Sequence, residues 1–173
     1  MSNPLVTVIE KCVAALQSAD PQGSIETILH DAAAGPAVAD TVAGYAKFSS
    51  LDDLAIHRSE SLTLLAGSLP PGFSAAPHNH NLWSVVSVCR GQEDNRFFRR
   101  NGDGLEQIGE ASVVGPGTLA NDADVIHAIR NPLETPLLVL HAYGGDLFAT
   151  PRSNWDPVTH KEVPYDWKQV RSD

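Results

Sequence analysis

Three of the seven histidines in this sequence stand where they can share one metal ion. His78 and His80 are two residues apart in a segment that enters a predicted strand. Side chains two apart on a strand point to the same face, roughly 7 Å apart along the backbone. His127 lies in a second β-rich segment and is the natural third ligand. Because neutral imidazole binds several transition metals, the pattern predicts a metal site made of three histidines.

Two further polar side chains, His141 and Tyr143, share one face of a later predicted strand. A tyrosine hydroxyl near a metal can donate a hydrogen bond or act as an acid, and the alternative is a tyrosine that only packs. Three of the remaining histidines fit ordinary surface or core positions: His30, His57 and His160.

The segments around the predicted ligands resemble the two cupin motifs. Residues 72–91, which contain the H-x-H pair, are similar to the first motif, except that Ser84 stands where that motif has a glutamate ligand. Residues 115–131 are similar to the second motif, with G-x-G followed by the histidine of H-x-x-x-N, which is His127. The resemblance implies a mainly β cupin double-stranded β-helix, which is a jelly-roll barrel.

A narrower resemblance covers residues 56–147. The phrase PHNHNLWSVVSVCRGQE looks like the P-x-H-D-H-x-x-W-G-x-x-G-x-x-x-G-x-E segment of bacterial thiol dioxygenases, which include cysteine dioxygenase and 3-mercaptopropionate dioxygenase. The phrase DVIHAIRNPLETPLLVLHAYGGDL resembles the metal-histidine strand of that family and the strand that follows it.

The resemblance to thiol dioxygenases implies one mononuclear iron(II) per chain, held by His78, His80 and His127. With dioxygen, such a protein converts a small thiol carboxylate, 3-mercaptopropionate or a cysteine-like compound, to its sulfinate. The same resemblance places His141 and Tyr143 in catalysis. A net positive charge on iron with three neutral ligands favours an anionic thiolate.

Arg58 is expected to bind the substrate carboxylate, because guanidinium suits a carboxylate and the segment IHRSES is similar to the arginine-bearing segment of the family; the alternative is an exposed arginine with no role. Trp83, followed by a small residue, resembles the 3-mercaptopropionate dioxygenase pattern and is the second residue expected at the substrate. Arg130 is a weaker choice, since strand alternation places it opposite His127. Two departures from the family matter: Val139 replaces the serine of a serine-histidine-tyrosine relay, and no cysteine lies near Ser84 to crosslink the tyrosine.

Two other functions stay open from the sequence. Three-histidine cupins include dioxygenases that cleave C–C bonds, as in β-diketones. A cupin that binds a metal or ligand without catalysis is the other candidate, because Val139 and Ser84 each remove a polar group that the chemistry could use. The metal itself is also open, since imidazole accepts zinc, nickel, manganese or copper as well as iron.

The elements that must position these residues fall into two parts. Apolar residues at helical spacing predict a helix over residues 4–19, a second from Ser24 to just before Gly35, and a third over 37–47. From about residue 61, short β-rich runs alternate with turn residues, which is typical of an all-β barrel.

A single cupin domain over residues 1–173 follows from this division, with N-terminal helices over 1–55 and the barrel over 56–148. Residues 101–104, Asn-Gly-Asp-Gly, predict a hairpin turn, because Asn and Gly tolerate positive φ. Residues 149–173 have little periodicity and are expected to wrap the surface or reach a neighbour, which makes a homodimer possible.

Composition argues against large anionic partners, and the resemblance to thiol dioxygenases implies a small thiol and dioxygen as the partners. The formal charge of -9, from 12 basic and 21 acidic residues, opposes binding to nucleic acid or an anionic membrane. No window has the roughly 18–20 apolar residues of a membrane span, and the amino terminus does not look like a secretory signal. A cytoplasmic location is expected, with Cys12 and Cys89 as buried thiols.

Overall fold

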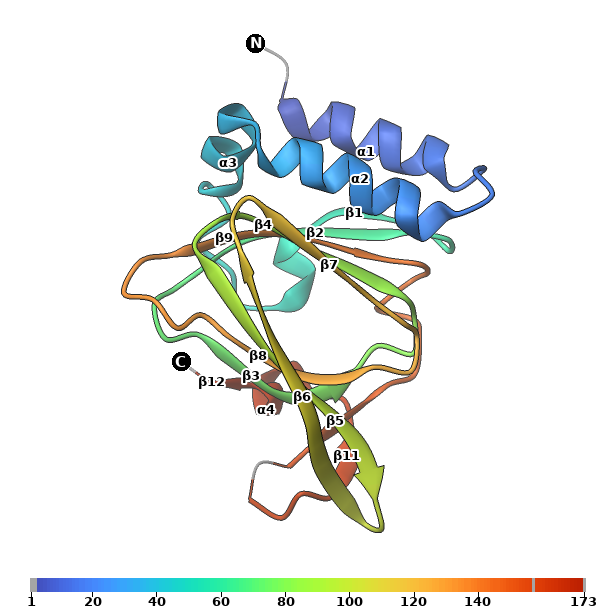
Figure 1. The fold of residues 1–173 in the computed structure, drawn as a ribbon, viewed down its shortest axis with the longest axis vertical. Coiled ribbons are helices and arrows are strands. Elements are labelled where there is room, and N and C mark those ends of the chain that lie inside the picture. The colour runs from blue at the N-terminus through green and yellow to red at the C-terminus, as the bar shows by residue number, and fades with distance from the viewer. Residues whose placement is uncertain (1–2, 157, 173) are drawn as a thin grey trace.

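Two antiparallel β-sheets face each other in the computed structural model of this chain, which describes residues 3–156 and 158–172 (Figure 1). The five-stranded sheet has the spatial order β1 (Ala55–Arg58), β2 (Thr63–Leu69), β9 (Leu137–Tyr143), β4 (Ser84–Arg90) and β7 (Gly117–Asn121). The seven-stranded sheet has the order β11 (Glu162–Pro164), β10 (Ser153–Trp155), β3 (Ser74–Asn79), β8 (Ile126–Arg130), β5 (Gln92–Asn101) and β6 (Gly104–Val114), and β12 (Arg171–Ser172) pairs with β3.

Strands that follow one another in sequence mostly change sheets. β2, β4, β7 and β9 lie in one sheet, whereas β3, β5, β6 and β8 lie in the other. Apart from the consecutive pairs β1–β2, β5–β6 and β10–β11, neighbours within each sheet are therefore distant in sequence, which is the winding of a jelly roll. The protein has the cupin double-stranded β-helix fold with a helical layer, so the predicted fold class is confirmed.

The five-stranded sheet is covered on both faces, and this explains its almost continuous apolar strands. Along β2, Leu64 packs toward the helices, whereas Leu65 points into the barrel. Along β9, Leu140 faces the helices and Val139 faces the barrel. Since side chains alternate across a strand, both sets of positions must be apolar where both faces are buried.

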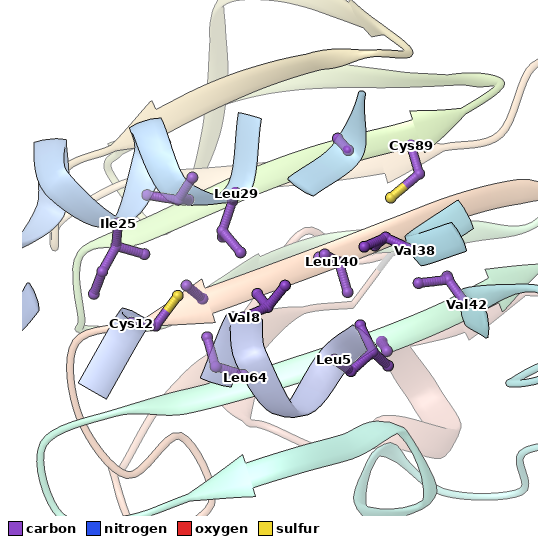
Figure 2. Close-up of a cluster of buried hydrophobic side chains, with 14 of the residues drawn as sticks. Leu5, Val8, Cys12, Ile25, Leu29, Val38, Val42, Leu64, Cys89 and Leu140 are labelled. Atoms are coloured by element: carbon purple, nitrogen blue, oxygen red, sulfur yellow. The ribbon is translucent and has the colours of Figure 1, made fainter. Parts of the chain in front are cut away.

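Three N-terminal helices form the layer over this sheet (Figure 1): α1 (Pro4–Ala15), α2 (Pro21–Ala33) and α3 (Pro36–Val42). Each begins with proline, whose missing N–H would have had no helical partner. Figure 2 shows Val8 and Leu29 from the helices close to Leu64 and Leu140 of the sheet. The helices therefore share one hydrophobic core with the outer face of the sheet.

The predicted helices exist, but their ends differ. The second begins at Pro21 rather than at Ser24, because the Asp20 side chain accepts a hydrogen bond from Gly23 N at 3.0 Å and caps the helix earlier. The first ends at Ala15 and the third at Val42, each short of the predicted end. A short 3₁₀ helix, η1 (Leu51–Leu54), then leads into β1.

The structure contains the hairpin turn and the two buried thiols that the sequence predicted. β5 ends at Asn101 and β6 begins at Gly104, with Gly102 at φ 56°, so the predicted hairpin turn is confirmed. Cys12 and Cys89 are free and buried, and burial raises the pKa of the Cys12 thiol to about 12 and that of Cys89 to about 11. In the described part of the chain, no helix is long and apolar enough to cross a membrane.

The C-terminal segment belongs to the barrel to a greater extent than its sequence suggested. β10 pairs with β3, where Asn154 lies opposite His78, and Trp155 is buried. The short helix α4 (Trp167–Val170) begins with Trp167, whose ring lies 6.4 Å from that of Phe73. Strands of three residues or fewer show no periodicity, so the sequence could not indicate them.

Candidate metal centre

The three predicted ligands meet inside the barrel. β3 and β8 are neighbours, and their register places His78 directly opposite His127. His80 follows the end of β3, and its ring centroid lies 5.0 Å from each of the other two. One nitrogen from each histidine lies within 4.8 Å of the others, and all three side chains are buried. These three residues could therefore hold one metal ion.

Hydrogen bonds fix how two of these imidazoles are presented. The carbonyl oxygen of Ala76 lies 2.9 Å from His78 Nδ1, and since a carbonyl only accepts, Nδ1 must carry the proton. His127 Nδ1 lies 2.8 Å from the side-chain oxygen of Asn95. Both rings therefore leave Nε2 as a lone-pair donor, as metal-bound histidines do when a second group holds the other nitrogen.

The cluster also has the protonation state that a metal needs. Burial lowers the pKa of His78 to about 4 and holds the pKa values of His80 and His127 well below the usual range. The rings are therefore neutral near pH 7. His127 Nε2 is buried without a hydrogen-bond partner, which is costly unless something binds it. These residues fit a divalent transition metal.

A cavity of about 60 Å³ adjoins the three histidines. Its walls are mostly apolar, with residues from both sheets, such as Val86, Ile129 and Val139. One water occupies roughly 10–15 Å³ of such volume, so the space suits a ligand of only a few heavy atoms. Ser84 lines this cavity and lies within 3.5 Å of the Asn121 amide, and in the described residues no carboxylate joins the cluster.

Tyr143 and His141 line the same cavity from β9, on the opposite sheet. The Tyr143 ring centroid lies 4.8 Å from that of His80, and its hydroxyl lies 3.2 Å from His141 Nδ1. Burial raises the pKa of Tyr143 well above its usual range, so the phenol keeps its proton at neutral pH. The two predicted catalytic residues are thus brought together beside the three ligands.

Comparisons with known proteins do not assign this chain to a family. No protein-family model matches the sequence, and no curated protein matches it either. Oxalate decarboxylase from Bacillus subtilis is 19% identical over 53% of this chain and 22% of its own, with a TM-score of 0.44. A protein with a double-stranded β-helix domain from Klebsiella pneumoniae is 14% identical over 61% of this chain and 82% of its own, with a TM-score of 0.49.

An 11S globulin from Wrightia tinctoria is similar to a comparable degree, at 14% identity over 54% of this chain and 22% of its own, with a TM-score of 0.44. This chain thus spans less than a quarter of the oxalate decarboxylase and of the globulin. Function has to be inferred from the side chains of the site.

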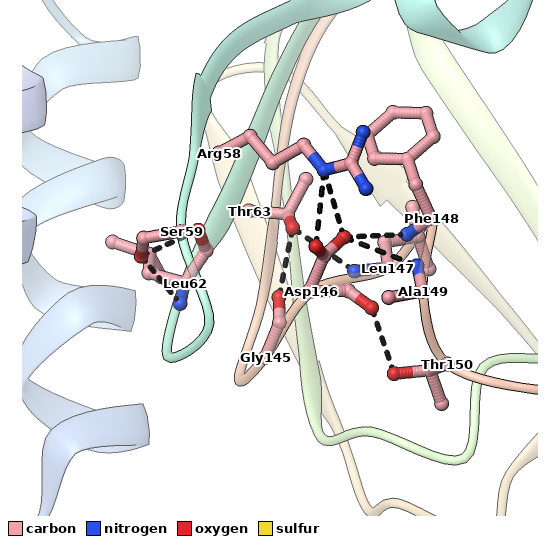
Figure 3. A network of polar contacts seen from close by, with 10 residues as sticks. All are labelled: Arg58, Ser59, Leu62, Thr63, Gly145, Asp146, Leu147, Phe148, Ala149 and Thr150. Carbon is pink, nitrogen blue, oxygen red and sulfur yellow. Dashed lines mark hydrogen bonds and ion pairs between the residues drawn. The ribbon is translucent and has the colours of Figure 1, made fainter.

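The two residues expected to bind substrate do not line the cavity. Arg58 donates from Nε to both oxygens of Asp146, at 2.9 and 3.1 Å, and lies over the Phe148 ring (Figure 3). This guanidinium lowers the pKa of the Asp146 carboxyl, and its charge is already paired. Trp83 packs against Gly144, where a Cβ would overlap the indole, and belongs to the core beneath the helices.

The guanidinium that lines the cavity is instead that of Arg152, just before β10. It lies 3.4 Å from the centroid of the Tyr165 ring, and its charge lowers the pKa values of His78 and His80. Among the described residues, no carboxylate forms an ion pair with Arg152. The weaker candidate Arg130 lies on the outer face of its sheet, as alternation predicts.

No role is predicted from the sequence for Glu93 and Asn95 on β5, although Glu93 is the last residue of the phrase PHNHNLWSVVSVCRGQE. Glu93 is fully buried, and its carboxylate contacts both Asn95 and His141. A signal was present, because these two polar residues alternate along one face of a strand that pairs with the strand of His127. It was weak, since the intervening positions are polar as well.

Proposed function

We propose that this protein is a non-haem iron(II) thiol dioxygenase that converts a small thiol carboxylate to its sulfinate. The observation that carries the proposal is the meeting, in one small cavity, of three neutral histidines, a tyrosine hydroxyl and a guanidinium without a carboxylate partner among the described residues. The overall reaction adds both atoms of dioxygen to the thiol sulfur, so no other reductant is required.

Iron(II), when bound by His78, His80 and His127, would supply the activation of dioxygen and a positive charge that favours the thiolate form of the substrate. The three histidines are neutral, so that charge is not cancelled by the protein. The donor set alone suits several metals, and iron is proposed because dioxygen chemistry requires a redox-active ion.

Arg152 is the residue proposed to bind the substrate carboxylate. A guanidinium forms two parallel hydrogen bonds with a carboxylate, and its stacking on Tyr165 holds the plane in place. The small volume of the cavity restricts the chain between carboxylate and thiol to a few carbons. The arrangement therefore favours substrates such as 3-mercaptopropionate or cysteine, and Arg152 replaces Arg58 in this proposed role.

Tyr143 is proposed to orient the reacting groups. Its hydroxyl remains protonated in the buried site and is held by His141. The surrounding side chains are mostly apolar, and a less polar surrounding strengthens each hydrogen bond within the cavity. The phenol can thus hold or supply a proton beside the substrate.

The test is oxygen uptake by the iron(II)-loaded protein with 3-mercaptopropionate, cysteine and cysteamine, followed by product identification with isotopically labelled dioxygen. We expect a sulfinate that carries two labelled oxygens. Arg152→Gln should raise KM about tenfold or more for the two carboxylates, with little change for cysteamine, which lacks one. Arg58→Gln is the matched control and should leave all three thiols unaffected.

Two results would overturn the proposal. Oxygen uptake that requires a β-diketone and fails with every thiol would move the protein to C–C cleavage. Protein that binds no transition metal after anaerobic loading with iron(II) would not be an oxygenase of this kind. A KM change in Arg58→Gln, with none in Arg152→Gln, would return the carboxylate site to Arg58.

A further inference from the structure

One fully buried carboxylate connects the metal cluster to the tyrosine. Glu93 lies near the start of β5, its side chain points into the barrel, and it has no exposed surface. One of its oxygens, Oε1, accepts a hydrogen bond from Asn95 Nδ2 at 3.1 Å, and the other, Oε2, lies 3.2 Å from His141 Nε2. Within the described residues, no lysine or arginine forms an ion pair with Glu93, so these contacts are what offset its desolvation.

The first contact determines the tautomer of a metal ligand. Glu93 Oε1 accepts from Asn95 Nδ2, so the amide of Asn95 turns its NH₂ group toward Glu93. Its oxygen then faces His127, 2.8 Å from Nδ1, and can only accept. The proton of His127 must therefore lie on Nδ1, and Nε2 is left free for the metal.

The second contact determines the tautomer of the histidine beside Tyr143. Glu93 Oε2 lies 3.2 Å from His141 Nε2 and accepts a hydrogen bond from it, so Nε2 carries a proton. In a ring with this single proton, His141 Nδ1 is the acceptor for the Tyr143 hydroxyl, 3.2 Å away. Val139, two residues before His141 on the same face of β9, has no polar atom that could do this.

We propose that Glu93 is a positioning residue that sets the tautomers of two histidines at once, His127 through Asn95 and His141 directly. The part of this inference that concerns His127 depends only on the three-histidine cluster. The part that concerns His141 and Tyr143 rests on the proposed function. Val139 cannot orient His141, and Glu93 orients it instead from the opposite sheet.

Glu93→Gln is the informative variant because glutamine has the same shape but only one acceptor group. Its carbonyl can serve Asn95 or His141, and its NH₂ must face the other. Either the Asn95 amide turns over and presents a donor to His127, or His141 moves its proton to Nδ1. At least one of the two histidines must therefore change tautomer.

The first measurement is nitrogen-15 NMR of histidine-labelled, metal-free protein, which reports the protonated nitrogen of each ring. We expect Nδ1–H for His127 and Nε2–H for His141 in the unmodified protein, with a change in one or both in Glu93→Gln. Glu110→Gln, an exposed carboxylate on the neighbouring strand β6, is the matched control and should change neither. Wild-type tautomers of both rings in Glu93→Gln would overturn the inference.

The second measurement uses Asn95→Ala, which breaks only the link to His127 and keeps the inference testable if Glu93→Gln does not fold. Loss of a hydrogen bond to a metal-binding histidine typically costs about 10–100-fold in affinity. We expect a loss of that size for zinc(II), measured by competition with a chelator, with the tautomer of His141 unchanged. Wild-type zinc affinity in Asn95→Ala would contradict the assignment.

These readouts separate the inference from the proposed function. Neither the tautomers nor the zinc affinity involves a thiol or dioxygen. If no thiol is oxidised while both variants behave as expected, the proposed function fails and the role of Glu93 stands. If thiols are oxidised and both variants keep wild-type tautomers and zinc affinity, the role of Glu93 fails and the proposed function stands.

Discussion

At the scale of single residues, the site depends on polar groups whose partners are other side chains. His127 is held by Asn95, Asn95 by Glu93, and Glu93 by His141. Each group in this series is buried or nearly so, where an unmade hydrogen bond costs about 1–3 kcal/mol. A change at one residue should therefore affect groups beyond its immediate neighbour.

Tyr143→Phe tests the hydroxyl without removing the ring. The ring packs beside His80, so its shape should be kept and zinc(II) affinity should change by less than about twofold. Because the phenol is the group proposed to hold a proton in the cavity, kcat for the best thiol should fall by about tenfold or more. Steady-state kinetics of the iron-loaded variant provide the measurement, and an unchanged kcat would make the hydroxyl a spectator.

At the scale of elements, the side chains of β9 alternate between two surroundings, the cavity and the helical layer. Val139, His141 and Tyr143 face the cavity, whereas Leu138, Leu140 and Ala142 pack against the helices. The helical layer thus stabilises the strand that carries the proposed catalytic residues, but it lies on the other face of the sheet. A substitution in the helical layer should therefore lower the stability of the fold without changing its affinity for a metal.

Leu29→Ala in α2 tests that separation. Leu29 is buried, and replacing a buried leucine by alanine typically costs about 2–5 kcal/mol of unfolding free energy. Urea denaturation should show a loss in this range, while the folded variant keeps its zinc(II) affinity. Val13→Ala on α1, at a position 40% exposed, should cost less than about 0.5 kcal/mol. A tenfold loss of zinc affinity in Leu29→Ala would show that the layer also shapes the site.

The sequence could predict the elements whose signal is local. The spacing of His78 and His80 and the alternation of His141 and Tyr143 are properties of single strands, and the structure brings both pairs to the same cavity. Proposing Arg152 in place of Arg58 depends on two contacts, the pairing of Asp146 with Arg58 and the addition of β10 to the sheet beside β3. Those contacts join residues far apart in the chain, and no periodicity reports them.

At the scale of the whole molecule, the site lies between two sheets that contribute different groups. The three histidines come from β3, its end and β8 of the seven-stranded sheet, while Tyr143 and His141 come from the five-stranded sheet. The C-terminal segment completes the cavity with Arg152, Tyr165 and Trp167. An ion that binds only the folded barrel, and not the unfolded chain, must therefore stabilise the whole fold by mass action.

Thermal unfolding measures this coupling. Metal at about 100 times its Kd should add about 2.7 kcal/mol, and each kcal/mol moves Tm by about 2–4 °C in a domain of this size. A rise of roughly 5–11 °C is expected with zinc(II) or iron(II), reversed by a chelator. His127→Ala should abolish the rise, whereas His160→Ala, at an exposed position outside the cluster, should keep it. Equal loss in both variants would mean that the ion binds elsewhere, because only the first removes a nitrogen from the cavity.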